Sequence, residues 1–349
     1  MARKKIAIVG AGVIGLTTAC ELSSDFEITV LGDLIGRETD SWKATAIWHV
    51  YLVPETEEVL KWAQQTLEKL YAISLEEKNA GVGLVKGLEL FRKGFAERPT
   101  WANIPRTFRM LSQDEINEFN NISSLGFLRE EEIRMLVEKP VLWGYEIEAP
   151  VADMLIYLEW LKSKAIESGV KIHRQHVESL ESLFSGFDIV INCTGFRARE
   201  IANDKNFKSF RGQYFVLRSN SDAPVDYIGD DDHPGGMAYF IPRFGEVMIG
   251  GCAEEGLETL DITLDWEDTI NRAGLYAPWV RERKIEDQAR DAVVGLRPFR
   301  EGGIRLERDI NCNKGLLLHN YGHGGSGFSL SWGCAKKIKE LIEECFSVV

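Results

Sequence analysis

Several features that would assign a function quickly are missing from this sequence. No apolar run reaches the roughly 18 residues that cross a membrane, so we expect no membrane span. The six cysteines lie far apart, with no C-x-x-C pair and no zinc-ligand spacing, so we expect reduced thiols and no metal site. Acidic residues outnumber basic residues by 54 to 41, and the net charge of −13 opposes binding to nucleic acid or to anionic membranes.

The ends of the chain carry no recognisable address. The first residues run directly into a predicted strand, which leaves no signal peptide, and the last residues differ from the peroxisomal S-K-L signal. We therefore expect a cytoplasmic protein. Its 349 residues, 44% hydrophobic and 27% charged, are ordinary for a globular protein and suffice for two domains. The oligomeric state is open, with a homodimer as one option.

The opening stretch, 5–33, has the pattern of a βαβ unit that binds a dinucleotide. A β-branched run at 6–9 predicts a buried strand, apolar residues at helical spacing follow, and 28–31 predicts a second strand. Between the first strand and the helix stands the motif G-x-G-x-x-G. The expected dinucleotide contacts are Gly10, Gly12, Val13, Ile14, Gly15 and Asp33, the last just past the end of the second strand.

Each part of this motif has a physical role. The first glycine makes a tight turn, the second lets the backbone approach a pyrophosphate, and the third allows the helix to pack on the strand. Phosphates then meet the N–H groups and the positive dipole of the helix N-terminus. Asp33 can accept a hydrogen bond from a ribose hydroxyl, although Gly32 takes the place at the strand end itself. A glycine-rich turn that only packs tightly is the alternative, and the motif does not distinguish FAD from NAD(P).

The rest of the chain predicts further regular elements. Helices are expected at 57–71, 152–168, 265–275, 277–285 and after the glycine-rich loop 322–327, and strands at 82–91, 170–173, 188–194, 214–217, 239–242 and 247–250. The segment 36–52 is interpreted as a loop near a ligand. The acid run 230–232 is interpreted as a solvated loop rather than a metal site. If strands near residues 1, 190 and 320 share one sheet, the first domain is discontinuous.

Seven motifs, spread over nearly the whole chain, occur together in one order. They are VGAGVIGL at 9–16, ATAIWHVY at 44–51, VINCTG at 190–195, RGQ at 211–213, YFIPRFGEVMIGG at 239–251, VGLRPFREGGIRLE at 294–307 and HNYGHGGSGFSLSWG at 319–333. In combination they resemble the D-amino-acid oxidase and D-aspartate oxidase family. The resemblance implies an α/β fold with a Rossmann-type FAD-binding domain (1–75, 145–210 and 290–349) and an inserted mixed β-sheet substrate domain (76–144 and 211–289).

By the same resemblance the cofactor is FAD, bound without a covalent link. Its further contacts would be Ser41, Thr45, Ala46, Ile47, Val177, Cys193, Thr194, Gly195, Gly322, Gly324, Ser326, Gly327, Phe328 and Ser329. The loop before the last helix offers backbone N–H donors at a second helix N-terminus, which suits the anionic end of a cofactor ring. A tight turn that needs positive φ is the alternative for this loop.

The resemblance also assigns a substrate site. Arg297 would hold the carboxylate of a D-amino acid, which a guanidinium fork matches bidentately. Tyr239 would add its hydroxyl, Gly325 would offer its carbonyl to the amine, and His49 would line the pocket. Each side chain has a plain structural alternative: a surface ion pair for the arginine, a core aromatic for the tyrosine, and a hydrogen-bonded structural residue for the histidine.

Two departures from the family pattern concern the substrate. Gly235 and Ala253 stand where relatives commonly have a second tyrosine or arginine, so we expect a wider or more open pocket. Glu254 and Glu255 follow. A carboxylate at this place would favour a basic or polar substrate side chain and disfavour D-aspartate.

The reaction that the resemblance implies is oxidative deamination. A hydride passes from Cα to flavin N5, oxygen reoxidises the flavin and gives hydrogen peroxide, and water hydrolyses the imine to a 2-oxo acid and ammonia. Because position and electrostatics supply the catalysis, no general base is required if the amine binds neutral. Glycine or sarcosine oxidation, a dehydrogenase that uses an electron carrier, and a non-catalytic nucleotide-binding or redox-sensing protein remain the alternatives.

Overall fold

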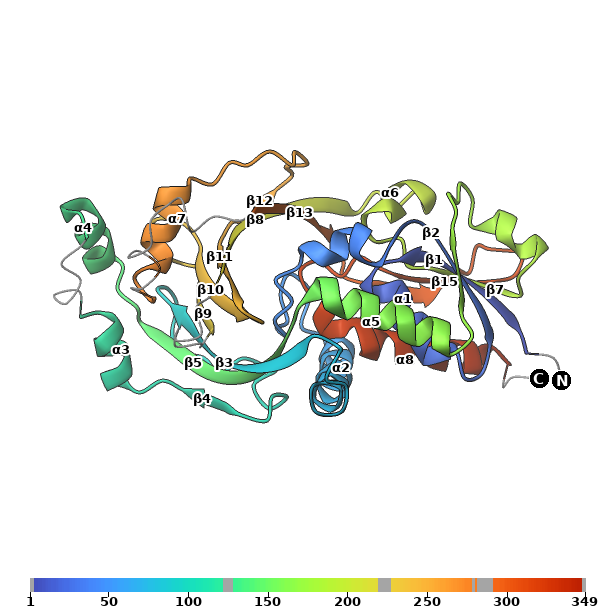
Figure 1. Cartoon of the computed structure of the whole chain (residues 1–349), viewed down its shortest axis with the longest axis horizontal. Helices are drawn as coiled ribbons and strands as arrows, with labels where there is room; N and C mark the ends of the chain where they lie inside the picture. Colours follow the sequence, from blue (N-terminus) through green and yellow to red (C-terminus); the bar gives the residue numbers. More distant parts are fainter. Residues whose placement is uncertain (1–2, 122–127, 219–226, 278–279, 281–290, 347–349) are drawn as a thin grey trace. The chain divides into compact units, whose positions relative to one another are not determined.

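The computed structural model describes residues 3–121, 128–218, 227–277, 280 and 291–346 (Figure 1). The chain divides into two compact units. The first unit comprises Met1–Gly83, Ala152–Phe210 and Leu296–Val349, and the second comprises Leu84–Val151 and Arg211–Gly295. Each unit is therefore assembled from segments that lie far apart in the sequence.

The first unit is built on a six-stranded, mainly parallel sheet. In sheet order its strands are β14 (Arg305–Arg308), β15 (Leu316–Tyr321), β7 (Ile189–Asn192), β1 (Lys5–Ala11), β2 (Glu27–Ile35) and β6 (Lys171–Arg174). β14 runs antiparallel to β15, whereas the other neighbouring strands are parallel. The fully buried side chains of Ile6 and Ile8 explain why β1 lies at the centre. The sheet joins strands from near residues 1, 190 and 320, which confirms the sequence prediction.

Helices cover this sheet. They are α1 (Val13–Leu22), α2 (Glu57–Glu76), α5 (Met154–Glu167), α6 (Ala198–Ile201) and α8 (Gly327–Phe346), with short 3-10 turns at Gly36–Glu38, Asp40–Lys43, Glu181–Ser185 and Gly195–Arg197. α1 packs against both α5 and α8, and α8 packs against α2 (Figure 1). Side-chain caps define two starts, because Thr56 accepts from the Val59 N–H and Asp153 from the Leu155 N–H.

The second unit is built on a larger, mixed sheet. In sheet order its strands are β12 (Glu254–Glu255), β8 (Phe207–Arg218), β11 (Glu246–Gly250), β10 (Ala238–Arg243), β9 (Tyr227–Asp230), β3 (Val82–Phe91), β5 (Trp143–Ala152) and β4 (Phe108–Met110), and β13 (Asp291–Arg300) pairs with β8. The pair β3 and β9 is parallel, while β8, β11, β10 and β9 form antiparallel pairs. The described helices of this unit are α3 (Gln113–Phe119), α4 (Glu130–Glu138) and α7 (Trp266–Ala273).

The apolar core of the second unit lies between the sheet and α7, which packs against β10 and β11. Phe215, Phe240 and Ile249 contribute from the strands, and Ile270 contributes from the helix. This packing fixes the central strand β10, which carries one of the predicted substrate residues.

The structure corrects two sequence predictions. Asp33 does not follow its strand but lies inside it, because β2 continues to Ile35 after a register shift against β1. Asp230 is not part of a solvated loop. It is fully buried at the end of β9, where its carboxylate accepts a 2.7 Å hydrogen bond from Arg92 and another from Tyr276. The cation and the hydroxyl both donate to Oδ2, which offsets part of the cost of burying this acid, while Oδ1 is buried without a partner among the described residues.

The other predicted strands and helices are found, with shifted ends. The helix expected at 265–275 is α7, and the helix expected at 277–285 falls almost entirely outside the described residues. Within the described part of the chain, no helix combines the length and the apolar character that crossing a bilayer requires. The same residues contain no cluster of histidine, cysteine and carboxylate side chains suited to holding a metal ion.

Candidate active site

The glycine motif forms a close-packed turn between β1 and α1. A Cβ atom on Gly10, whose φ is +110°, would lie 2.3 Å from the Cys193 carbonyl oxygen, and one on Gly15 would lie 1.8 Å from the Gly10 carbonyl oxygen. Gly12 is the N-cap of α1, and a Cβ there would lie 2.8 Å from the Ser41 hydroxyl. The glycines are therefore required by packing at the start of α1.

Several predicted cofactor residues meet at this turn. The Val13 N–H donates to the Ser41 hydroxyl at 3.0 Å, which places 36–52 beside the start of α1. The strand β7 ends beside β1, where the Cys193 N–H donates to the Val9 carbonyl at 2.7 Å. Thr194 bonds back to Asn192 through its hydroxyl at 2.7 Å. These contacts lie at the carboxyl edge of a parallel sheet, where such folds bind their ligands.

Asp33 lies at the same edge with two unlike oxygens. Its Oδ2 accepts from the Arg197 guanidinium at 3.0 Å and lies 2.9 Å from the His176 Nδ1. Its Oδ1 is buried and has no hydrogen-bond partner within the described part of the chain. The same guanidinium donates to the Val177 carbonyl at 2.7 Å, so a third residue connects two predicted adenosine contacts. Sequence reasoning missed Arg197, and its place two residues after the VINCTG motif was the available signal.

The glycine-rich loop before α8 is joined to the segment around Tyr51. The Ser326 hydroxyl accepts from the Tyr51 N–H at 2.7 Å and donates to the Tyr51 carbonyl at 2.8 Å. The Ser329 hydroxyl accepts from the His49 N–H at 3.0 Å. A Cβ on Gly325 would lie 2.5 Å from the Tyr51 ring, so the loop approaches this ring closely. Both predicted serines thus hold the backbone of 49–51.

The remaining residues predicted for the ring end occupy the same two stretches. Gly322 and Gly324 have positive φ values of 84° and 53°, as the tight-turn interpretation requires. Ala46 also has a positive φ of 53°, and its carbonyl accepts from the Ala152 N–H at 2.9 Å. Their neighbours in these stretches are Thr45, Ile47, Gly327 and Phe328.

Arg297 lies on β13, in the part of this strand from Leu296 onward that belongs to the first unit, and its side chain approaches Tyr51. Its guanidinium carbon is 5.7 Å from the centre of the Tyr51 ring, within the range of a cation–π contact. The next residue, Pro298, accepts a 3.0 Å hydrogen bond from the Gly324 N–H, which ties β13 to the glycine-rich loop. The structure therefore brings Arg297, Tyr51 and the 324–325 backbone together within the first unit.

Two histidines in this region are neutral at neutral pH. Burial lowers the pKa of His49 to about 4 and the pKa of His323 to about 3. The His323 Nε2 is buried and has no partner among the described residues. Neither imidazole therefore adds a positive charge beside Arg297.

Tyr239 belongs to the second unit, at the start of β10. It pairs with Gly250 of β11 and with Gly229 of β9. A Cβ on Gly250 would lie 2.6 Å from the Tyr239 hydroxyl oxygen, and one on Gly251 would lie 2.5 Å from its ring. These glycines make room for the tyrosine, which is buried except for 8% of its surface.

The two positions that depart from the family pattern also lie in the second unit. Gly235 donates to the His233 Nδ1 at 3.1 Å and accepts from Arg272 at 2.9 Å. Ala253 is exposed between Gly251 and β12. Both positions are therefore backbone of connecting segments, without a bulky side chain.

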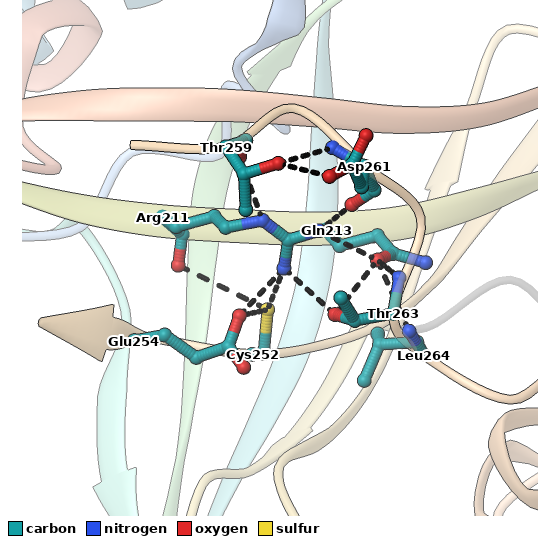
Figure 2. Close-up of polar contacts among 8 residues, drawn as sticks. All are labelled: Arg211, Gln213, Cys252, Glu254, Thr259, Asp261, Thr263 and Leu264. Atoms are coloured by element: carbon teal, nitrogen blue, oxygen red, sulfur yellow. Dashed lines mark hydrogen bonds and ion pairs between the residues drawn. The ribbon is translucent and has the colours of Figure 1, made fainter. Parts of the chain in front are cut away.

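Arg211 organises the segment that follows β11, as Figure 2 shows. Its guanidinium is fully buried and donates to the Glu254 carboxylate at 2.5 Å, to the Thr263 hydroxyl at 2.9 Å, and to the carbonyls of Thr259 and Asp261. Gln213 lies two residues after Arg211 on β8, and its side-chain oxygen accepts from the Thr263 N–H at 2.8 Å. The Glu254 carboxylate is thus paired with Arg211, which removes the basis for expecting it to select a basic substrate side chain.

Comparison with known proteins extends over nearly the whole chain. The family model described as FAD dependent oxidoreductase matches residues 5–341. A D-amino-acid oxidase of Rubrobacter xylanophilus is 33% identical over 345 residues, which cover 98% of this chain and 97% of that protein. The human D-aspartate oxidase is 29% identical and covers 98% and 95%. The crystal structure of glycine oxidase from Geobacillus kaustophilus matches with a TM-score of 0.75 at 18% identity, covering 99% and 95%, and this likeness concerns the fold.

Proposed function

Since the chain belongs to the FAD dependent oxidoreductase family, with FAD as its cofactor, we propose that it is a D-amino-acid oxidase. The reaction would convert a D-amino acid to the 2-oxo acid and ammonia, with oxygen as the final electron acceptor and hydrogen peroxide as the second product. The identity with a D-amino-acid oxidase over 98% of the chain supports this class of substrate.

The residues of the first unit suit the cofactor. The cradle around Gly10, Gly12 and Gly15 excludes side chains and leaves the helix backbone to a pyrophosphate. The buried Oδ1 of Asp33, which has no hydrogen-bond partner among the described residues, would accept from a ribose hydroxyl. The N-terminus of α8 offers its dipole to the ring end. When bound, FAD accepts the hydride that leaves Cα.

One observation carries the substrate assignment: the placement of Arg297 beside the glycine-rich loop. The hydrogen bond from Gly324 to Pro298 holds the arginine and the carbonyl of Gly325 on neighbouring backbones. A guanidinium can bind the substrate carboxylate bidentately, and a carbonyl can accept from its amine. Two such groups on one wall orient an α-amino acid by its two polar ends, which is how positioning contributes to catalysis.

The other proposed roles follow from charge and from the resemblance. His49 would line the pocket without a charge, because burial lowers its pKa to about 4. The amine of the substrate would therefore have no charged imidazole beside it, and the carboxylate of the substrate would pair with the Arg297 guanidinium. Tyr239 would donate its hydroxyl to the same carboxylate, an assignment that rests on the YFIPR motif.

The experiment that tests the reaction is peroxide release by the purified protein against paired D- and L-amino acids, with glycine and sarcosine included. Peroxide from D-enantiomers alone is the expected result. Activity on glycine or sarcosine alone would replace the proposal by an amine oxidase. Dye reduction without peroxide would replace it by a dehydrogenase, and bound flavin with no turnover in either assay would indicate a non-catalytic protein.

The matching variant is Arg297→Ala. Losing a bidentate charged contact should lower kcat/KM by roughly 100- to 1000-fold while FAD stays bound. Arg297→Lys should recover little, because an ammonium does not reproduce the fork. Arg308→Ala, at an exposed arginine on β14, is the control for loss of charge. A kcat/KM for Arg297→Ala within threefold of the wild type would contradict the assignment.

A further inference from the structure

Asp33 has one oxygen that the protein uses and one that it leaves unpaired. Oδ2 receives Arg197 at 3.0 Å and lies 2.9 Å from His176, whereas the buried Oδ1 has no partner within the described residues. A buried acceptor without a hydrogen bond is costly, and a bound ligand is one of the ways in which such a group is satisfied. The position is the carboxyl end of β2, beside the glycine turn.

Arg197 determines which oxygen is used. It ends the short turn Gly195–Arg197 that follows β7, and its Nη1 holds Asp33 while its Nη2 donates to the Val177 carbonyl at 2.7 Å. A guanidinium can serve both acceptors at once because its N–H groups diverge in one plane. Arg197 therefore connects the end of β7, the end of β2 and residue 177 in one rigid arrangement.

His176 and Arg174 support the same arrangement from the neighbouring strand. The His176 Nε2 lies 3.3 Å from the Arg197 Nη2, and the Arg174 guanidinium donates to the Asp33 carbonyl at 2.7 Å. Arg174 also forms an ion pair with Glu38 at 2.7 Å. The backbone and one carboxylate oxygen of Asp33 are thus held on several sides, which leaves Oδ1 as the oxygen without a hydrogen-bond donor among the described residues.

We propose that Arg197 is a positioning residue for the adenosine end of FAD, which it serves by holding Asp33 so that Oδ1 accepts a hydrogen bond from the ribose. The inference rests on FAD as cofactor and is independent of the substrate. In the absence of the guanidinium the carboxylate can rotate, and the ribose hydroxyl loses a fixed acceptor. Affinity for FAD then falls, while the chemistry at the other end of the cofactor is unaffected.

The test compares the affinity of two protein variants for two ligands, so that the effects of the protein change and of the ligand change can be separated. Apoprotein of the wild type and of Arg197→Met is titrated with FAD and with FAD whose adenosine ribose lacks both hydroxyls, followed by flavin fluorescence. Arg197→Met should raise the Kd for FAD by about tenfold, the size of one charge-assisted hydrogen bond, and should leave the Kd for the dideoxy analogue unchanged. Arg199→Met is the matched control, since Arg199 lies two residues on and packs over the Phe196 ring.

A second readout separates positioning from loss of fold. The thermal unfolding midpoint of the apoprotein should change little in Arg197→Met, and Arg197→Lys should restore part of the FAD affinity. Equal weakening of FAD and of the dideoxy analogue, or an unchanged Kd for FAD, would overturn the proposal. Neither result depends on turnover, so failure of the D-amino-acid oxidase assignment would leave this test intact.

Discussion

Two arginine–carboxylate pairs, Arg211 with Glu254 and Arg197 with Asp33, do opposite things in this molecule. Arg211 is fully buried in the second unit, and its donors reach a carboxylate, a hydroxyl and two loop carbonyls. Arg197 is 30% exposed in the first unit, and its carboxylate partner keeps a buried oxygen that has no donor among the described residues. The guanidinium of the first pair finds its acceptors within the second unit, whereas we propose that a ligand supplies the donor that the second pair lacks.

The difference teaches how to separate structural from ligand-binding arginines. A buried guanidinium is tolerated when the protein itself supplies every acceptor, and its removal then leaves loop carbonyls unpaired. Beside Arg197 one buried acceptor, Asp33 Oδ1, is left over among the described residues, and we propose that bound FAD supplies its donor. Asp230 Oδ1 is left over in the same way beside Arg92, so an unpaired oxygen points to this ligand only because Asp33 lies at the cofactor edge of the first sheet. The acceptor count together with the place in the fold distinguishes the two pairs, whereas the ion-pair distances of 2.5 and 3.0 Å do not.

The largest expected effect is a loss of folding stability at acid pH, and it should involve both units because each contains a buried histidine. Burial lowers the pKa of His49 and His323 in the first unit to about 4 and about 3, and the pKa of His233 in the second unit to about 3. The unfolded chain takes up these protons near pH 6.5, and the folded chain does not. Stability is therefore full above pH 6.5 and falls as the pH drops toward 4.

Urea unfolding at pH 7.5, 6.0 and 5.0 measures this loss. His323→Gln should flatten the pH profile, whereas the same change at His176, which is 60% exposed, should not. A urea midpoint that is equal at pH 7.5 and pH 5.0 would contradict burial of the neutral imidazoles.

The next effect is specific to the second unit. Arg211→Met should lower the free energy of unfolding by about 3 kcal/mol. The change leaves two loop carbonyls and the Glu254 carboxylate without the donor that the guanidinium supplies. The urea midpoint of the holoenzyme reports this loss. The Kd for FAD, measured where the variant is folded, should stay within about twofold. If Arg211→Met weakens FAD binding more than it weakens the fold, the contrast between the two pairs is wrong.

The smallest expected effect is the loss of folding stability when the Arg197–Asp33 pair is removed. Arg197→Met should change the free energy of unfolding of the apoprotein by less than about 1 kcal/mol, because both side chains of the pair are roughly one-third exposed. Urea unfolding of the apoprotein measures it. A loss as large as that of Arg211→Met would place Arg197 among the structural residues.

Local pattern determined much of the fold and of the candidate site. Alternating apolar runs and glycines located β1, α1, β7 and β10, because burial and backbone geometry act over a few residues. The same information located Gly10, Gly12 and Gly15, whose Cβ atoms the turn has no room for. The family resemblance predicted Arg297 and Gly325 as contacts of one substrate, and the structure joins their neighbours Pro298 and Gly324 by a hydrogen bond.

Polar partners across long separations were decided by tertiary structure alone. Arg197 meets Asp33 across 164 positions, and Arg211 meets Glu254 across 43. Asp230 reads as a solvated acid in sequence and is buried because Arg92, the residue after β3, reaches it. Such contacts leave no periodic pattern in the sequence, because an ion pair depends on which side chains the folded backbone brings within about 3 Å of each other. The sequence therefore predicted where a cofactor could bind, and the tertiary structure decided which side chains hold the Asp33 carboxylate at that place.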